Sequence, residues 1–288
     1  MPIDPTTALG AELPGQEFSW TPSDVQTYHL GLGAGRDWTD PAELAYLDDR
    51  APRVLPTFAT VAPGVRNTGA PRVSMPGVEI DLAKVVHAHQ EVVVHRQIPA
   101  AGRARSSGRI AEIWDKGSAA VVVQEHTVTD TEGRALWTTR SSIFAKGEGG
   151  FGGDRGPSAT IETPSRSADF EVLVPTMPQQ ALLYRMCGDR NPLHSDPAFA
   201  RAAGFPAPIL HGLCTYGIAC KTATDTFLEG DTTRVGGFRA RFAGVLFPGE
   251  TLRVRGWQNG GSDLTLSVTA VERDDAPVLA DASLTALV

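Results

Sequence analysis

The sequence predicts an α+β protein made of two similar halves, each an antiparallel sheet wrapped around a buried helix. Three observations lead to this prediction. Valine-rich, partly alternating segments separated by glycine-containing turns are typical of antiparallel strands. A long apolar segment after His211-Gly212 is typical of a buried helix. Several residues also recur at a nearly constant offset, which indicates an internal repeat.

The composition is that of a soluble globular chain, long enough for one large or two ordinary domains. Of the 288 residues, 41% are hydrophobic and 20% are charged, and the formal net charge is −7. This acidic balance argues against nucleic acid as the main partner. We expect no membrane span and no leader segment. Three cysteines at unpatterned spacing favour a reducing compartment, so we expect a cytoplasmic location.

The repeat relates a segment near the N-terminus to one in the second half. An offset of 156 positions links Pro22, Tyr28 and Asp40-Pro41 to Pro178, Tyr184 and Asp196-Pro197. An offset of 155 links Val54-Leu55 to Ile209-Leu210.

On this alignment the first half lacks the polar residues of the second. The paired positions are Gly33 with Asp189, Trp38 with His194, and Pro56-Thr57 with His211-Gly212. We therefore expect one active site per chain, in the second half, and a first half that supplies binding surface.

The GLGAG segment at residues 31–35 matches part of a dinucleotide-binding fingerprint. It follows no apolar strand, and Arg36 occupies the place of the third glycine. We do not expect this segment to bind a dinucleotide.

Four segments of the first half are predicted strands: residues 85–99, 104–117, 119–130 and 135–147. The second half shows the same pattern, with turns at Pro248-Gly249, Asn259-Gly260 and Asp274-Asp275. We interpret each half as a helix followed by these strands. Glycine, proline and serine mark a linker between the halves. The predicted boundaries are 1–150 for the first half, 151–167 for the linker and 168–288 for the second half.

Residues 184–217 concentrate the side chains that acid–base chemistry uses. Asp189, Asn191 and His194 lie within six positions, and Gly188 and Pro192 indicate a loop. A carboxylate and an imidazole that face each other can hold one water molecule and exchange its protons. Asn191 offers both a donor and an acceptor, so it can orient the loop or the water.

Two helix starts follow this loop. Asp196-Pro197 is a predicted N-cap and first helical residue, with Gly204 as the stop. His211-Gly212 precedes the buried helix, whose free N–H groups and positive end can stabilise an oxyanion. The two features together suit the addition of water to a double bond conjugated to a carbonyl.

Each of these residues alone has a structural interpretation. Asp189 can cap a helix, and His194 can be a hydrogen-bonded core histidine; only their combination favours an active site. A metal site of Asp189, His194 and His211 is not predicted, because their spacing fits no compact ligand pattern. A calcium loop that starts at Asp189 would require glycine where His194 stands.

The stretch resembles the signature of hydratase 2, the (R)-specific enoyl-CoA hydratases of the MaoC-like group. The shared residues are an aromatic residue, GDRNPLH, a DPxxA segment and the PILHGL turn. The segments VVHAHQ, WDKG, GGFGG and RFAGVLFPGETL are similar to the family as well, so the resemblance covers nearly the whole chain. It implies a double hot-dog fold, in which two repeats each wrap an antiparallel sheet around a helix.

The resemblance also implies roles for particular residues. Those that would be catalytic are Asp189, His194, Asn191 and Gly212. Those that would contact the substrate are His87, Ala88, Lys116, Arg190, Pro192, Leu193, His211 and Phe242. Ala88 stands where the family has glycine, and Lys116 would lie near the CoA. No metal or redox cofactor is implied, and the family suggests a homodimer.

The resulting hypothesis is the reversible hydration of a trans-2-enoyl-CoA to a (3R)-3-hydroxyacyl-CoA in fatty-acid β-oxidation. The carbonyl oxygen would lie at the Gly212 N–H, and Asp189 and His194 would hold the water. Which of them is base and which is acid stays open, because a coupled pair titrates jointly. The alternatives are a dehydratase acting on acyl-carrier-protein substrates, a thioesterase, and a non-catalytic acyl-CoA-binding protein.

Overall fold

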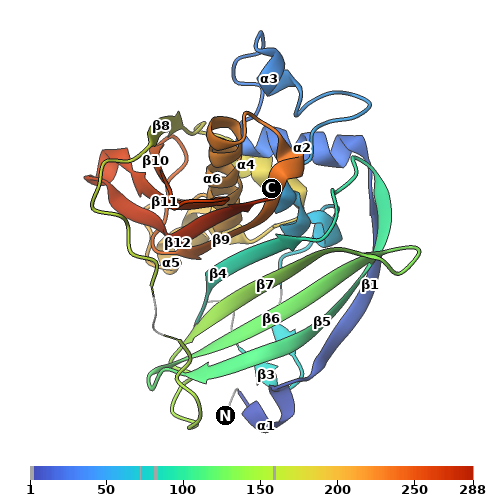
Figure 1. Cartoon of the computed structure of the whole chain (residues 1–288). Helices are drawn as coiled ribbons and strands as arrows, with labels where there is room; N and C mark the ends of the chain where they lie inside the picture. The colour runs from blue at the N-terminus through green and yellow to red at the C-terminus, as the bar shows by residue number, and fades with distance from the viewer. Residues whose placement is uncertain (1–2, 72, 81–83, 158–159, 288) are drawn as a thin grey trace.

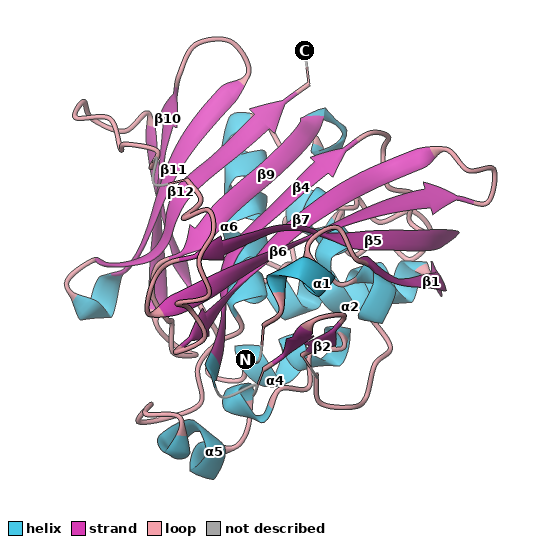
Figure 2. Ribbon diagram, turned by 90° about the horizontal axis from the view of Figure 1, so that it is seen from below, coloured by secondary structure: helices cyan, strands magenta, loops and turns pink. Residues whose placement is uncertain are grey.

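The protein is built on one ten-stranded antiparallel sheet that curves around a group of helices (Figures 1 and 2). The computed structural model describes residues 3–71, 73–80, 84–157 and 160–287. The strand order is β1-β5-β6-β7-β4-β9-β12-β11-β10-β8. The five strands on one side of this order come from the first half of the chain, and the other five come from the second half.

The described elements of the first half are, in chain order, α1 (Pro5–Ala8), β1 (Glu12–Trp20), α2 (Pro22–Leu32), α3 (Pro41–Leu44), η1 (Pro56–Thr60), η2 (Ala62–Gly64), β2 (Ser74–Met75), β3 (Val78–Glu79), β4 (Val85–Val94), β5 (Gly102–Asp115), β6 (Ala119–Asp130) and β7 (Ala135–Lys146).

Those of the second half are β8 (Phe170–Pro175), α4 (Gln180–Tyr184), η4 (Arg185–Cys187), η5 (Pro192–His194), α5 (Pro197–Ala202), α6 (Gly212–Phe227), η6 (Thr232–Arg234), β9 (Val235–Phe242), β10 (Thr251–Gln258), β11 (Asp263–Ala270), η7 (Val271–Arg273) and β12 (Ala276–Ala286). The predicted strands and turns of both halves are confirmed. β4 ends at Val94, short of the predicted residue 99.

Two edge strands precede the helices, so the prediction that each half begins with its helix is wrong. β1 and β8 form the two outer edges of the sheet. β1 contains Pro14 and Gly15, and its register with β5 slips between Leu13 and Gln16. An edge strand tolerates proline because one of its sides needs no ladder hydrogen bonds. Because Pro14 and Gly15 are typical of loops, the sequence did not indicate the strand β1.

The helix α6 forms the centre of the second half, as predicted. Its residues from Cys214 to Thr224 are all buried. The hydroxyl of Tyr216 donates a hydrogen bond of 2.6 Å to the carbonyl of Phe238, which fastens the helix to β9. Polar groups buried at this depth need such partners. α6 is therefore held in one position relative to the sheet.

The first half has no equivalent of this long helix at the corresponding place; the helix with buried residues in this half is the shorter α2. After Leu55 the chain forms only the two short 3-10 segments η1 and η2. Pro63 lacks an N–H, and its ring would clash with the carbonyl four residues earlier in an α-helix. The helix therefore cannot continue past this point.

The N-terminal segment covers the inner face of the first-half sheet where the helix is missing. Ile3 and Val78 are fully buried there against Ile110 and Val122. Figure 1 shows α1 and β3 beneath the strands β5 and β6. These short elements bury the sheet face that a long helix covers in the second half.

The strands β4 and β9 join the two halves into one sheet. They pair antiparallel, with Val92 opposite Phe238 and His89 opposite Arg241. The sheet is therefore continuous between the halves. The chain boundaries at residues 150 and 167 stay a prediction.

The repeat is visible in the helix ends. Asp40 and Asp196 each cap a short helix with a proline at its first position. Gly33 and Gly188 each end a helical segment in the left-handed conformation, which aligns Gly33 with Gly188 and not with Asp189. Gly31 lies inside α2, where its carbonyl accepts a 2.7 Å hydrogen bond from Gln180 of α4. The GLGAG segment thus packs helix against helix.

Candidate active site

The loop that carries the predicted acid and imidazole is shaped at its start by Gly188. This residue has φ +103°, a conformation that a side chain strains. A Cβ here would also overlap the carbonyl of Gly64 in η2. The first half therefore presses directly on the turn that delivers Asp189, so both halves contribute to the geometry of the site.

Asn191 organises the rest of the loop. Its backbone N–H donates to Asp189 Oδ1 at 3.1 Å, and its side-chain Oδ1 accepts from the N–H of Leu193 at 3.1 Å. It is thereby the N-cap of η5, with Pro192 at the first position. Of the two predicted roles for Asn191, orienting the loop or the water, the contacts favour the loop.

His194 is buried, with 8% of its surface exposed, and one of its ring nitrogens has a fixed partner. Nδ1 lies 2.9 Å from the carbonyl of Ile209. A carbonyl only accepts, so Nδ1 carries the proton, and Nε2 of the neutral ring offers a lone pair. Burial lowers the pKa of His194, and the nearby Asp189 charge opposes that shift. The neutral tautomer with a free Nε2 is therefore favoured.

His211 lies behind this pair and touches both members. Its ring stacks on His194 with centroids 3.7 Å apart, and its Nε2 lies 3.3 Å from the backbone carbonyl of Asp189. Only 1% of its surface is exposed. Burial, followed by the neighbouring His194, holds the pKa of His211 well below its usual value. His211 is thus a neutral residue that packs against the pair, a role the sequence did not suggest.

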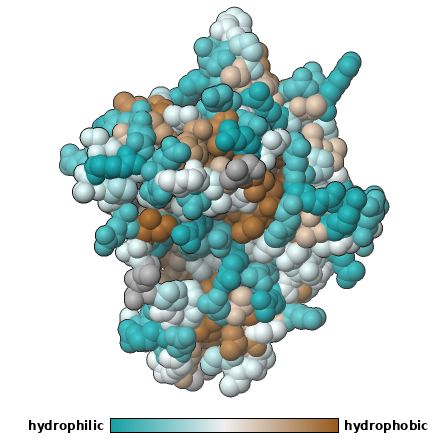
Figure 3. All heavy atoms as spheres, in the orientation of Figure 1, coloured by the Kyte–Doolittle hydropathy of each residue, from teal (hydrophilic) through white to brown (hydrophobic). Residues whose placement is uncertain are grey.

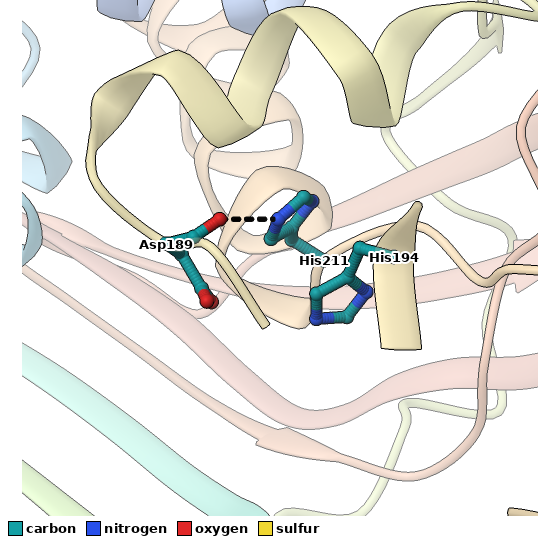
Figure 4. Close-up of side chains that lie close together, drawn as sticks. All are labelled: Asp189, His194 and His211. Carbon is teal, nitrogen blue, oxygen red and sulfur yellow. Dashed lines mark hydrogen bonds between the residues drawn. The ribbon is translucent and has the colours of Figure 1, made fainter. Parts of the chain in front are cut away.

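The structure brings the predicted acid and imidazole together. The carboxylate of Asp189 and one ring nitrogen each of His194 and His211 lie within 4.8 Å of one another. Figure 4 shows the Asp189 side chain and the His194 ring on the same side of His211. One water molecule between the carboxylate and Nε2 of His194 could hydrogen-bond to both.

Asp189, His194 and His211 are close enough to be considered as ligands of a metal ion. The rings of His194 and His211 are stacked with their planes 28° apart. Each lone pair lies in the plane of its own ring, so two stacked rings do not aim their lone pairs at one common point, whereas the tetrahedral sites typical of zinc need donors that converge on the ion. The geometry favours a shared water over an ion. The absence of a metal cofactor stays a prediction.

The predicted oxyanion residue, Gly212, is the first residue of α6. The N–H groups of the first helical turn have no partner inside the helix, and the helix dipole adds positive potential there. A Cβ at this position would lie only 3.0 Å from the ring of Phe242, so the glycine lets the aromatic ring pack against the backbone. Phe242 thus packs against the amino end of α6, and its contact with the substrate stays a prediction.

His87 extends the site onto β4. Its ring lies 4.7 Å from that of Phe242, and burial lowers the pKa of His87 to about 4. The register of β4 shifts between His87 and His89, which marks a bulge at Ala88. The bulge places these neighbouring residues beside different spaces, because Ala88 lines a cavity on the outer face of the sheet.

This outer cavity also contains Lys116. It has a volume of about 820 Å³ and is bordered by strands of both halves and by the linker residues Pro157, Thr160 and Ile161. Figure 3 shows apolar atoms gathered on this face where the halves meet. In the described part of the chain, Lys116 contacts the Trp114 ring and the carbonyl of Pro157, and not the catalytic loop.

The remaining predicted contacts belong to the loop itself. Arg190, Pro192 and Leu193 are half-buried. The Nε of Arg190 is buried and has no hydrogen-bond partner among the described residues. Tyr184, the aromatic residue that opens the motif and also marks the repeat, packs 5.0 Å from the ring of His211. Nothing in the sequence indicated that Tyr184 is fully buried beside the histidine that precedes α6.

Comparison with known proteins shows the family of this chain. The profile of the MaoC like domain matches residues 159–276, and that of the MFE-2 hydratase 2 N-terminal domain matches residues 18–147. The enoyl-CoA hydratase ChsH3 of Mycobacterium tuberculosis is 56% identical over 284 residues, 99% of each chain. The chain belongs to the MaoC-like hydratase 2 family.

A plant hydratase and a solved dehydratase structure are also similar to this chain over most of its length. The peroxisomal enoyl-CoA hydratase 2 of Arabidopsis thaliana is 36% identical over 270 residues, 88% of this chain and 86% of that protein. The crystal structure of a MaoC-like dehydratase from Phytophthora capsici has a TM-score of 0.86 at 26% identity and covers 99% and 98% of the two chains.

The double hot-dog fold is confirmed. A Mycobacterium tuberculosis protein described as having a double hot-dog fold aligns with a TM-score of 0.59 at 14% identity, over 98% and 97% of the chains. As a member of a dehydratase family, this hydratase 2 homologue is an enzyme of the hydro-lyase class. Among the helices of the described residues, none has the length and hydropathy that crossing a bilayer requires.

Proposed function

We propose that this hydratase 2 homologue catalyses the reversible hydration of a trans-2-enoyl-CoA to a (3R)-3-hydroxyacyl-CoA. The supporting observation is the placement of the Asp189 carboxylate and the free Nε2 of His194 beside the amino end of α6. Relatives named as enoyl-CoA hydratases support the reaction class. The (3R) configuration follows the hydratase 2 resemblance.

In this proposal the thioester carbonyl accepts a hydrogen bond from the N–H of Gly212. Water attacks the β-carbon, and negative charge develops on the carbonyl oxygen as an enolate. The N-terminal end of α6, against which Phe242 packs, stabilises that charge. The α-carbon then receives a proton, which completes the addition of water.

Asp189 and His194 hold the attacking water and move its protons. The neutral His194 tautomer offers a lone pair at Nε2, so this atom can accept a proton from water and later return one. The carboxylate of Asp189 accepts a second hydrogen bond from the same water. The two groups titrate jointly, so the roles of base and acid are assigned to the pair and not to either residue alone.

The CoA part of the substrate would occupy the outer cavity. Ala88 and Lys116, both expected to contact the substrate, line this space. The His87 ring contacts Phe242, and Phe242 packs against Gly212, so a thioester bound at Gly212 would have to pass these two rings to reach the cavity. Hydration transfers no electrons, so the proposal requires no redox cofactor, and in it Asp189 and His194 hold the water without a metal.

We further propose a homodimer in the cytoplasm. Leu30 of α2 and Leu182 and Met186 near α4 expose about half of their surfaces, at 48%, 52% and 52%. α2 packs against α4, so these apolar side chains lie on neighbouring elements, where a second copy could cover them. The three cysteines are free buried thiols, which suits a reducing compartment. Sedimentation velocity would test the dimer.

The decisive experiment follows crotonyl-CoA and a longer enoyl-CoA by loss of the conjugated thioester absorbance. Hydration predicts loss of absorbance without release of free thiol, and chiral analysis should show the 3R product. Thiol release would identify a thioesterase. Binding without turnover would identify a non-catalytic acyl-CoA-binding protein, and activity only with the carrier-protein thioester would identify a carrier-specific dehydratase.

A further inference from the structure

A row of apolar side chains leads away from the active site across the first-half sheet. His87 on β4 lies opposite Ile143 on β7, and the row continues through Val122 on β6 to Ile113 on β5. Directly opposite residues point to the same face of a sheet. This is the inner face, because side chains alternate along a strand and the neighbours that line the outer cavity are Phe144, Val121 and Trp114. We call Ile143, Val122 and Ile113 the inner strip.

The near end of the inner strip adjoins the reacting groups. The His87 ring contacts Phe242, which packs against the backbone of Gly212, the proposed contact of the thioester carbonyl. Ile143, opposite His87, is only half-buried. An alkyl chain that leaves the thioester along this face would cover Ile143 and leave water, and each buried methylene strengthens binding about fourfold. The inner strip can therefore hold the first carbons of an acyl chain.

The far part of the inner strip is covered by the N-terminal segment and the β2–β3 hairpin. Ile3, Ala8 and Val78 are 1%, 0% and 0% exposed, and they share one hydrophobic cluster with Val122. This cluster is separate from the main core. We call Ile3, Ala8 and Val78 the N-terminal wall. Val122 is two strand spacings from His87, so the wall begins about 10 Å along the strip.

We propose that the N-terminal wall sets the length of acyl chain that the enzyme accepts. The inference rests on the proposed function. A short chain fits between His87 and the wall, whereas a longer chain must displace the wall. Displacement leaves the main core packed, because the wall belongs to the separate cluster. Ile3 and Ala8 precede residue 18, where the match to the hydratase 2 N-terminal domain begins, so the family resemblance carried no expectation about them.

The test compares kcat/KM for trans-2-hexadecenoyl-CoA with that for trans-2-octenoyl-CoA, both below their micelle concentrations. Val78→Ala and Ile3→Ala each shorten a wall side chain, so one or two further methylenes can be buried. Each variant should therefore raise the ratio of the long to the short substrate roughly tenfold. Val254→Ala is the matched control, because Val254 on β10 is an equally buried valine at 0% exposure. Its ratio should stay within about twofold of the wild-type value.

A disulfide across the wall provides a second test that does not depend on a cavity. Ile3 and Val78 are bridge partners, and the neighbouring Asp4 N–H donates to the Gly77 carbonyl at 2.8 Å. They are thus a non-hydrogen-bonded pair, whose Cα atoms lie about 4.5 Å apart, within the reach of a disulfide. In the double variant Ile3→Cys/Val78→Cys, the disulfide state should show a ratio roughly tenfold below that of the reduced state, measured after removal of the reductant.

Calorimetry with the saturated thioesters octanoyl-CoA and hexadecanoyl-CoA gives a readout that needs no turnover. Val78→Ala should strengthen binding of the long thioester roughly tenfold relative to the short one. Equal ratios in the wild type, Val78→Ala and Val254→Ala would overturn the inference, and so would equal ratios in the disulfide and reduced states. If the wild type hydrates neither enoyl-CoA, the proposed function fails, whereas calorimetry still decides whether the wall limits chain length.

Discussion

His211 stacks on His194 with ring centroids 3.7 Å apart, and its Nε2 lies 3.3 Å from the backbone carbonyl of Asp189. One buried side chain thus supports both members of the water-holding pair. The next residue, Gly212, supplies the proposed oxyanion contact. We infer that His211 positions these groups relative to one another and does not itself touch the reacting atoms.

The positioning role predicts a specific kinetic effect of His211→Phe. Phenylalanine keeps a ring against His194 and removes the hydrogen bond to the Asp189 carbonyl. We expect kcat to fall roughly tenfold and KM to stay within about twofold, because the cavity contacts are untouched. His211→Gln retains an N–H donor and should recover part of the loss. His95→Gln, at an exposed histidine, is the control. A change in KM alone, or a lower melting temperature with normal kcat, would contradict a positioning role.

Substitution within the pair should have a larger effect. Asp189→Asn and His194→Gln each remove one proton-transfer partner, and general acid–base groups contribute on the order of 10²–10⁴-fold to rate. Purified, folded variants should therefore lose roughly that factor in kcat/KM with crotonyl-CoA. Asp263→Asn, at an exposed carboxylate on β11, should leave the rate unchanged. Near-normal turnover in either active-site variant would refute the assignment.

Gly188→Ala tests how the first half shapes the catalytic loop. The new Cβ would overlap the Gly64 carbonyl at a residue with φ +103°, so the turn must shift and carry Asp189 with it. We expect a loss of stability of about 1–3 kcal/mol and a loss of activity of more than tenfold. Gly260→Ala is the matched control, because Gly260 has φ +80° and nothing within 4 Å of a Cβ. If both variants behave alike, backbone strain alone explains the effect.

The stability of the fold should decline in mild acid. His29 is fully buried between the carbonyl of Tyr46 and the N–H of Leu55, and burial lowers its pKa to about 3 from 6.5. Because the folded-state pKa is depressed, the unfolded chain binds the proton first as pH falls below 6.5. This histidine alone should therefore cost about 2 kcal/mol of unfolding free energy between pH 7 and pH 5.

Urea unfolding at the two pH values measures this loss. In His29→Gln the difference between the two unfolding free energies should shrink by about the same amount, although the variant is less stable at pH 7. An unchanged difference would show that other groups cause the acid sensitivity.

The sequence predicted those features that follow from local chemistry. Proline after aspartate marked α5, and the His211-Gly212 pair marked the start of α6. It did not predict β1, whose Pro14 and Gly15 resemble a loop, or the loss of a long helix after Leu55. Both depend on which tertiary partner is present, since an edge strand tolerates proline and the N-terminal segment replaces the missing helix.

In the active site, too, local contacts were predicted from the sequence and contacts between distant residues were not. The motif predicted that Asp189 and His194 lie together, because they share one short loop. It could not predict that Gly64 presses on that loop or that Arg239 reaches the outer cavity, because both contacts join residues far apart in the sequence. The His194–His211 stacking also escaped prediction, although the two residues are only 17 positions apart.

Lys221 provides a final prediction about how α6 is held. This residue is 8% exposed, and its Nζ lies 2.5 Å from Glu43 of α3 and 2.8 Å from Asp225. Lys221→Met would leave two carboxylates without their cation in a partly buried site, which should destabilise the fold by about 3–5 kcal/mol. Adding Glu43→Gln removes one of those charges and should restore part of the loss. Lys146→Met, at an exposed lysine, should be near neutral in the same urea titration. If the double variant is no more stable than Lys221→Met, the loss comes from packing of the lysine stem and not from charge.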